Sequence, residues 1–233
     1  MTAILRRELN SYFASPIAYV YLGLFTAFTG MIYFITVYSG LSSSTYIFAY
    51  SFYFSMYLVP VLTMRLLTEE RKQRTDQLLL TAPIRLFDIV AGKFLAAFVV
   101  YCAGMCSTVL EVFVLSFFCD FNWAVFWSSF IGIILLGGAS IAICMFVSSM
   151  TENQIIAAVV GFVVMLILSM LDAFSSLFSN PVLQEVMLKL SFYVRYFDLT
   201  LGVLDFSDIF FFLSVTGVFL FLTTRVIDRR RWS

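Results

Sequence analysis

Six long apolar runs dominate this sequence and constrain its fold more than any other feature. Each holds about twenty residues, the length that an α-helix needs to cross about 30 Å of hydrocarbon. Inside lipid every backbone amide has to bond within its own segment, so runs of this length should be helices. The chain is 62% hydrophobic and 12% charged, whereas a soluble domain is about 45–50% apolar and about 25% charged. We therefore predict an all-α polytopic membrane protein with six spans, at 17–39, 46–67, 93–119, 124–148, 155–174 and 208–227.

Lysine and arginine are distributed unevenly between the connections, and this bias predicts the orientation of the spans. If the N-terminus lies inside the cell, twelve of the fourteen basic residues fall on the cytoplasmic side. The two on the outer side are Lys189 and Arg195. We expect both termini to lie in the cytoplasm and residues 1–233 to form a single transmembrane domain.

Two stretches outside the spans also carry helical patterns. In residues 1–16 apolar side chains can share a face opposite Arg6 and Arg7, as in a basic amphipathic helix at the inner membrane interface. The outer segment 175–207 is long enough for structure of its own, and Asn180 followed by Pro181 is a favourable helix start. We expect short helices there, lying on the outer leaflet or dipping into it.

The densest group of charges lies between the second and third spans, in TEERKQRTDQLLLTAPIRLFDIVAGK at 68–93. Its acidic start suits a helix N-terminus, and Pro83 stops the run. Leu78, Leu79 and Leu80 follow a charged turn directly, and such a patch in a plain solvated loop would be a liability. The leucines need a cover, which could be the lipid surface, the protein's own spans or a groove on another protein.

This stretch resembles the sequence after the second span in permeases of the ABC type-2 exporter family. That pattern is an acidic and basic turn, a Thr-x-x-Leu-Leu-Leu-(Thr/Ser)-x-Pro run and a segment ending in Gly-Lys. Four more segments are similar to the family: RRELNSYFASPIAYV at 6–20, SSMTENQIIAA at 148–158, YFDLTLGVLDFSDIFFFL at 196–213 and the tail RVIDRRRW. Their order and spacing cover nearly the whole chain and are closest to the six-span gliding-motility-associated permeases. The chain departs from the pattern at Arg74, where the family often has Gly, which favours a more helical turn.

The resemblance implies a permease subunit of an ATP-driven exporter in the bacterial cytoplasmic membrane, paired with a second permease and two separate ATP-binding cassette subunits. It implies that 68–83 is a coupling helix that docks in a groove of the ATPase and carries its motion into the spans. The coupling residues would be Glu69, Glu70, Arg71, Arg74, Thr75, Leu78, Leu79, Leu80 and Pro83. The family handles hydrophobic or amphipathic cargo such as lipids, peptides and polysaccharides. Export and force transmission to an extracytoplasmic accessory protein both stay open.

No catalytic machinery of the chain's own is predicted. A phosphate-binding loop needs G-x-x-x-x-G-K-[ST], but Gly92-Lys93 is followed by Phe94 and preceded five residues earlier by Phe87. ATP and magnesium would be bound by the partner. The chain has no histidine and no net charge, which disfavours zinc or haem sites and a nucleic-acid partner. A membrane enzyme acting on lipids would need a polar catalytic cluster that the sequence lacks, whereas a non-transporting scaffold or assembly factor is not excluded.

Glu111 is the carboxylate that lies deep in a predicted span, about 12 Å from the outer end of the third. An ionisable group inside a membrane indicates function by default, so Glu111 could line a translocation path or pair across a dimer. The alternative is a protonated side chain bonded to a neighbouring Ser or Thr, such as Ser107 or Thr108. Small residues in the next two spans predict close helix packing, and they are Gly132, Gly137, Gly138, Ala142, Ala157 and Gly161.

Overall fold

The computed structural model describes residues 2–40, 44–72, 86–118, 122–175, 178 and 180–231. Every element within these ranges is a helix. In chain order the elements are α1 (Thr2–Ala14), α2 (Pro16–Tyr38), α3 (Ser44–Thr63), α4 (Arg65–Lys72), α6 (Leu86–Leu115), α7 (Trp123–Met150), α8 (Gln154–Ser169), α9 (Leu171–Ser175), α10 (Pro181–Leu190), α11 (Phe192–Thr200) and α12 (Phe206–Arg231).

Five helices are long and apolar enough to cross a membrane: α2, α6, α7, α12 and the helix that runs from α3 into α4. They lie where the sequence predicts spans. α2 begins at Pro16, and the Ser15 hydroxyl accepts a hydrogen bond from the Ile17 N–H at 3.4 Å. Proline suits this first helical position because an N–H there would have no partner in the helix. The described part of the chain is thus all-helical, and its helices are those of a multi-pass membrane protein.

The fifth predicted span, 155–174, forms a shorter helix than expected. Its residues make α8, which has 16 residues and is therefore about 24 Å long, against a hydrocarbon core about 30 Å thick. The chain turns at Met170 and continues as the short helix α9. Because the apolar run continues through this turn, hydropathy alone does not reveal the break. Five spans are supported, and the sixth stays a prediction.

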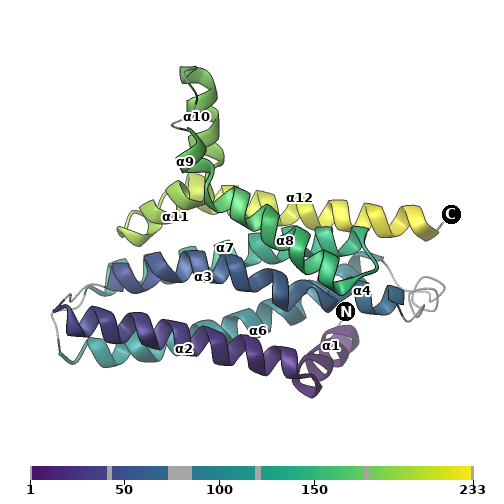
Figure 1. Ribbon diagram of the computed structural model, residues 1–233, viewed down its shortest axis with the longest axis horizontal. Coiled ribbons are helices and arrows are strands. Elements are labelled where there is room, and N and C mark those ends of the chain that lie inside the picture. The colour runs from purple at the N-terminus through teal and green to yellow at the C-terminus, as the bar shows by residue number, and fades with distance from the viewer. Residues whose placement is uncertain are drawn as a thin grey trace.

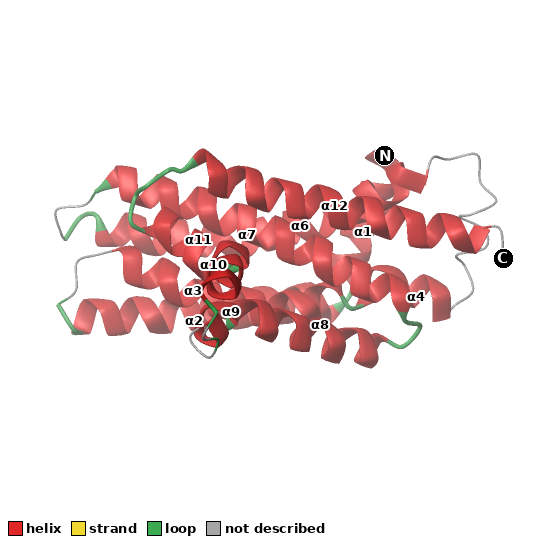
Figure 2. Ribbon diagram, turned by 90° about the horizontal axis from the view of Figure 1, so that it is seen from above, coloured by secondary structure: helices red, strands yellow, loops and turns green. Residues whose placement is uncertain are grey.

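α7 is the central helix of the bundle. It packs against α12, α3, α11, α8 and α6, and most of it is buried. α2 and α12 lie at the periphery and leave most of their apolar side chains exposed or half-buried. The long helices run along the longest axis of the molecule (Figure 1), and the view from above shows the same arrangement (Figure 2). In both views the two termini and α4 lie at one end.

Small residues let the helices approach closely, as the sequence predicts. A Cβ added at Gly137 on α7 would lie 2.1 Å from the ring of Tyr101 on α6, so the ring occupies the space that a larger residue would fill. The Tyr101 hydroxyl donates to the Ile133 carbonyl oxygen at 2.8 Å and accepts from the Ser55 hydroxyl at 2.8 Å. This contact joins α3, α6 and α7 in the core.

The segment between α8 and α12 contains two helices with different surroundings. α11 packs on α7 and α3, and the Tyr196 hydroxyl donates to the Phe48 carbonyl oxygen at 2.8 Å. α10 begins at Pro181 with Asn180 as its N-cap, as the sequence predicts. It extends away from the bundle (Figure 1), and none of its residues is buried. Whether these helices contact the outer leaflet stays a prediction.

Candidate functional site

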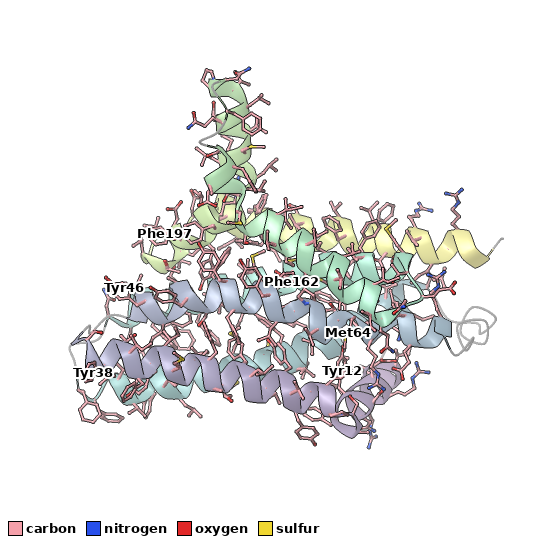
Figure 3. The ribbon with its side chains drawn as sticks, viewed as in Figure 1. Tyr12, Tyr38, Tyr46, Met64, Phe162 and Phe197 are labelled. Carbon is pink, nitrogen blue, oxygen red and sulfur yellow. The ribbon has the colours of Figure 1, made fainter. Side chains whose placement is uncertain are left out.

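The end of the bundle that holds both termini also holds the start of the charged region. There α3 ends at Thr63 and α4 begins at Arg65, with Met64 in a turn between them (Figure 3). We call residues 62–66 the α3–α4 joint. α4 continues to Lys72 and forms the described beginning of the charged region.

A proline and a threonine loosen the helix just before the joint. Pro60 lies inside α3, and because it has no N–H, a carbonyl one turn earlier loses its helical partner. The Thr63 hydroxyl donates back to the Val59 carbonyl oxygen at 2.9 Å, a pattern that often bends helices. The interruption at Met64 leaves carbonyl oxygens that accept side-chain donors, since buried backbone groups are rarely left unpaired. The Met64 oxygen accepts from the Thr68 hydroxyl of α4 itself as well as from a neighbouring helix.

Side chains from three other helices supply donors to alternate carbonyl oxygens of the joint. The three hydrogen bonds run from Tyr12 of α1 to the Leu62 oxygen at 2.9 Å, from Ser148 of α7 to the Met64 oxygen at 3.4 Å and from Lys93 of α6 to the Leu66 oxygen at 2.7 Å. Tyr12 and Met64 are labelled at this end of the bundle in Figure 3. The joint is therefore held from three sides by helices that are distant in sequence.

Lys93 is the charged member of this set, and it is almost completely buried. Its side chain is 1% exposed, and its Nζ lies 3.2 Å from Glu8 Oε1 on α1. Arg7 Nη2 lies 2.9 Å from the same oxygen. Burial raises the pKa of Glu8, but the positive charge of Lys93 and the hydrogen bonds from Arg7 and Lys93 outweigh it, so the pKa lies below its ordinary value. Glu8 is thus held ionised beside a buried ammonium group.

Two further ion pairs involve α4, one within the helix and one to the turn between α7 and α8. Arg65 binds Glu69 one turn later in α4, and its Nη2 donates to the Ser11 hydroxyl of α1 at 3.1 Å. Arg71 Nη2 lies 2.9 Å from Glu152 Oε1, in the turn between α7 and α8. Within the described ranges no group of three or more His, Cys, Asp or Glu side chains could hold a metal ion. The ion pairs and hydrogen bonds of this end of the bundle join helices to one another.

Glu111 lies away from this cluster, between α2 and α6. Its Oε1 accepts a hydrogen bond from the Thr29 hydroxyl at 2.9 Å, and its Oε2 is buried without a hydrogen-bond partner. The expected partners Ser107 and Thr108 instead donate to carbonyl oxygens of their own helix, at 2.7 and 2.9 Å. The partner of Glu111 is therefore a threonine, but it is neither Ser107 nor Thr108, whose hydroxyls donate one turn back. A partner from α2 takes their place.

Comparison with known protein families identifies the family to which this chain belongs. The sequence pattern of the "ABC-2 family transporter protein" matches residues 27–229. This chain belongs to the ABC-2 family. No curated protein matches the chain closely enough to count as a relative. As an ABC-2 permease, the chain is the membrane component of an ABC transporter, and membership of the family implies an ATPase partner.

The structure describes part of the region predicted to couple the permease to that partner. Glu69 and Arg71 lie in α4, where they form ion pairs with Arg65 and Glu152. Glu70 also lies in α4, but its side chain is outside the described residues. The remaining predicted coupling residues, which lie outside the described ranges, are Arg74, Thr75, Leu78, Leu79, Leu80 and Pro83. Their docking role stays a prediction.

Sequence reasoning missed the residues that hold the joint of this permease. Tyr12, Ser148 and Glu152 lie in segments that resemble the family, but nothing in one sequence shows that they meet. Lys93 had a usable signal, since a lysine within a long apolar helix needs a carboxylate or carbonyl partner. Glu8, an acidic residue in a basic N-terminal helix, was the partner to consider.

Proposed function

We propose that this ABC-2 permease belongs to an exporter and that a separate ATP-binding subunit drives it by docking on residues 68–83. The observation that carries the proposal is the attachment of α4. Three helices bind the joint that leads into α4, and the turn between α7 and α8 binds α4 itself through Glu152. An element that receives force from a partner has to be attached in this way to the helices it moves.

The chemistry of the region supports a protein partner. The pattern of alternating charges in 68–76 can orient a docking helix, while Leu78, Leu79 and Leu80 would fill an apolar groove on the ATPase. ATP and magnesium are held by the partner in this proposal, since the chain has no phosphate-binding loop. The permease contributes no group to hydrolysis and converts the movement of the ATPase into a movement of its spans.

The proposed orientation places both termini in the cytoplasm of a bacterial cell. Basic residues favour that side by twelve to two, and the two termini lie at the end of the bundle that holds α4 (Figure 1). This arrangement requires α8, with α9, to carry the chain back toward the outer end. A helix of 16 residues can do so if the protein around it excludes lipid or the bilayer is locally thin.

The proposed assembly is a pair of permeases, with the gliding-motility-associated permeases as the nearest type, and two ATPases. The exposed faces of α2 and α12 leave room for a second permease beside the first. Glu111, whose Oε2 has no partner, is the proposed polar point of the translocation path. An extracytoplasmic accessory protein would meet the outer segment, 175–207.

The test is the ATPase activity of the purified complex after reversal of Glu69 and Glu70 to lysine. We expect loss of the ATPase subunit from the complex, or loss of the activity that the permease stimulates. Glu185→Lys is the matched control, because it reverses an exposed carboxylate on α10, away from α4. Assembly and turnover that are unchanged in the double variant would contradict the docking role.

A further inference from the structure

The contacts at the α3–α4 joint differ in what they connect. Tyr12 and Ser148 each bind one carbonyl oxygen of the joint. Lys93 binds a joint carbonyl, that of Leu66, and also the side chain of Glu8 on α1. The Arg65–Ser11 hydrogen bond also joins α4 to α1, but the Arg65 side chain is 21% exposed, whereas the ammonium group of Lys93 on α6 fastens α4 and α1 together at a site where its side chain is 1% exposed.

The contacts of Lys93 to α4 and α1 matter because α1 is followed directly by the first span, α2. α1 ends at Ala14, and α2 begins two residues later at Pro16, with Ser15 as the N-cap between them. A movement of α1 therefore passes directly to the first span. α3, in contrast, is joined to α4 by the backbone of the joint, so it can receive a movement of α4 without a side-chain contact.

Burial makes the Lys93 contact a stiff one. Lys93 is 1% exposed, and water cannot replace a carbonyl or a carboxylate that moves away from a buried ammonium group. Glu8 is held in turn by Arg7, at 2.9 Å. Lys93, the Glu8 carboxylate and the Leu66 carbonyl group keep their geometry only if α1, α4 and α6 move as a unit.

We infer that Lys93 and Glu8 are positioning residues that transmit the movement of α4 to α1 and so drive the first span from its cytoplasmic end. The inference rests on the proposed function, in which an ATPase moves α4. It adds the route by which that movement reaches α2, a helix that does not contact α4 through any of the hydrogen bonds and ion pairs described above.

The experiment compares two reporters at the outer ends of the two spans. Tyr38 of α2 and Tyr46 of α3 lie at the end of the bundle opposite the joint (Figure 3) and are 85% and 45% exposed. Tyr38→Cys and Tyr46→Cys are made separately, with the native Cys102, Cys106, Cys119 and Cys144 replaced by alanine. The rate of labelling by a membrane-impermeant maleimide is measured in the assembled permease–ATPase complex, without nucleotide and after trapping with ATP and vanadate.

In the parent complex both reporters should change their labelling rate on trapping, by about fivefold or more if the coupling is of ordinary strength. Lys93→Met, which keeps the length of the side chain, should abolish the change at position 38 and preserve it at position 46. Glu8→Leu combined with Lys93→Met gives the same result in a variant that leaves no buried charge unpaired. Arg7→Gln is the control, since it removes a contact to Glu8 and leaves the Lys93 contacts to Leu66 and Glu8 in place, and it should preserve both changes.

The outcomes separate the two proposals. A lysine variant in which both reporters respond, or in which neither does while the complex stays assembled, overturns the inference and leaves the proposed function intact. A parent complex that assembles with an active ATPase but shows no change at either position overturns the proposed function and the inference with it.

Discussion

Two lysine–glutamate pairs in this chain are similar in distance and different in surroundings. Lys189 and Glu185 lie 2.7 Å apart on successive turns of α10, with side chains 68% and 67% exposed. Lys93 and Glu8 lie 3.2 Å apart on helices distant in sequence, with side chains 1% and 13% exposed. An exposed pair gains little because water screens it, whereas loss of one partner from a buried pair leaves a charge that water cannot reach. Burial, not distance, decides which pair matters.

The same contrast separates the two regions that hold these pairs. α10 is held by its cap at Asn180, by the pair within its own turns and by the adjacent helices α9 and α11, from which Arg195 donates to the Lys189 carbonyl oxygen at 2.7 Å. The joint depends on side chains from α1, α6 and α7. α10 can therefore change without disturbing the bundle, whereas a change at the joint is felt by several helices at once.

The largest expected effect is that of Glu8→Leu. It removes the carboxylate from Lys93, and loss of one partner of a buried pair costs about 3–5 kcal/mol. Because Glu8 is 13% exposed, we expect about 3 kcal/mol, the lower end of that range. The measurement is the free energy of unfolding in mixed micelles.

Two companion variants sharpen this prediction. Glu8→Leu with Lys93→Met should recover most of the loss, because an apolar pair of similar volume replaces the ions. Glu185→Leu on α10 should leave the unfolding free energy of the bundle unchanged. If the double variant were no more stable than Glu8→Leu alone, the single loss would come from packing and not from charge.

A smaller effect is expected from Tyr12→Phe. The Tyr12 hydroxyl donates to the Leu62 carbonyl oxygen in a buried site, and an acceptor left without its donor there costs about 1–2 kcal/mol. Asn180→Ala removes a cap of similar strength from α10, about 1 kcal/mol, but the effect should stay within that helix. Hydrogen exchange distinguishes them, since Tyr12→Phe should raise exchange in α1, α3 and α4 and Asn180→Ala in α10 alone.

Local signals made the helices of this chain predictable. Ser15-Pro16 and Asn180-Pro181 start α2 and α10 as expected because a cap and a proline act within one turn. The break at Met170 was not predictable from hydropathy, since most of the residues on both sides of it are apolar. The direction in which α10 leaves the bundle depends on packing among α8, α9 and α11, which no periodicity encodes.

In the candidate site, too, sequence patterns identified the local charged region but not the partners that lie far away in the sequence. Composition and pattern pointed to 68–93, and Glu69 and Arg71 do lie in a charged cluster there. The residues that hold the joint come from segments up to 84 positions away from the carbonyl oxygens they bind, the separation between Ser148 and Met64. One sequence cannot pair such positions. Glu111 shows the same limit, because its partner Thr29 lies on another helix.

The pH dependence of the free energy of unfolding should also report on the buried Glu8–Lys93 pair at the joint. Burial raises the pKa of Glu8, and Lys93 and Arg7 lower it by more, so the folded value lies below the ordinary 4.5. The stabilisation by this group is therefore complete above about pH 4.5 and is lost as pH falls through the folded pKa. Glu8→Gln should flatten that loss of unfolding free energy, measured between about pH 3 and pH 6. A pH profile identical to that of the parent would show that Glu8 does not carry the effect.

The smallest expected effect is that of Glu185→Gln, and it should depend on salt. Lys189 lowers the pKa of Glu185 by a hydrogen bond and by its charge, but both side chains are exposed and ions screen such a pair over about 8 Å at physiological ionic strength. Hydrogen exchange in α10 should therefore rise slightly at low salt and match that of the parent at high salt. Exchange in the long helices should not change under either condition. If Glu185→Gln instead raised hydrogen exchange in α7 or α12, α10 would contribute to the stability of the bundle. The contrast between α10 and the α3–α4 joint would then be wrong.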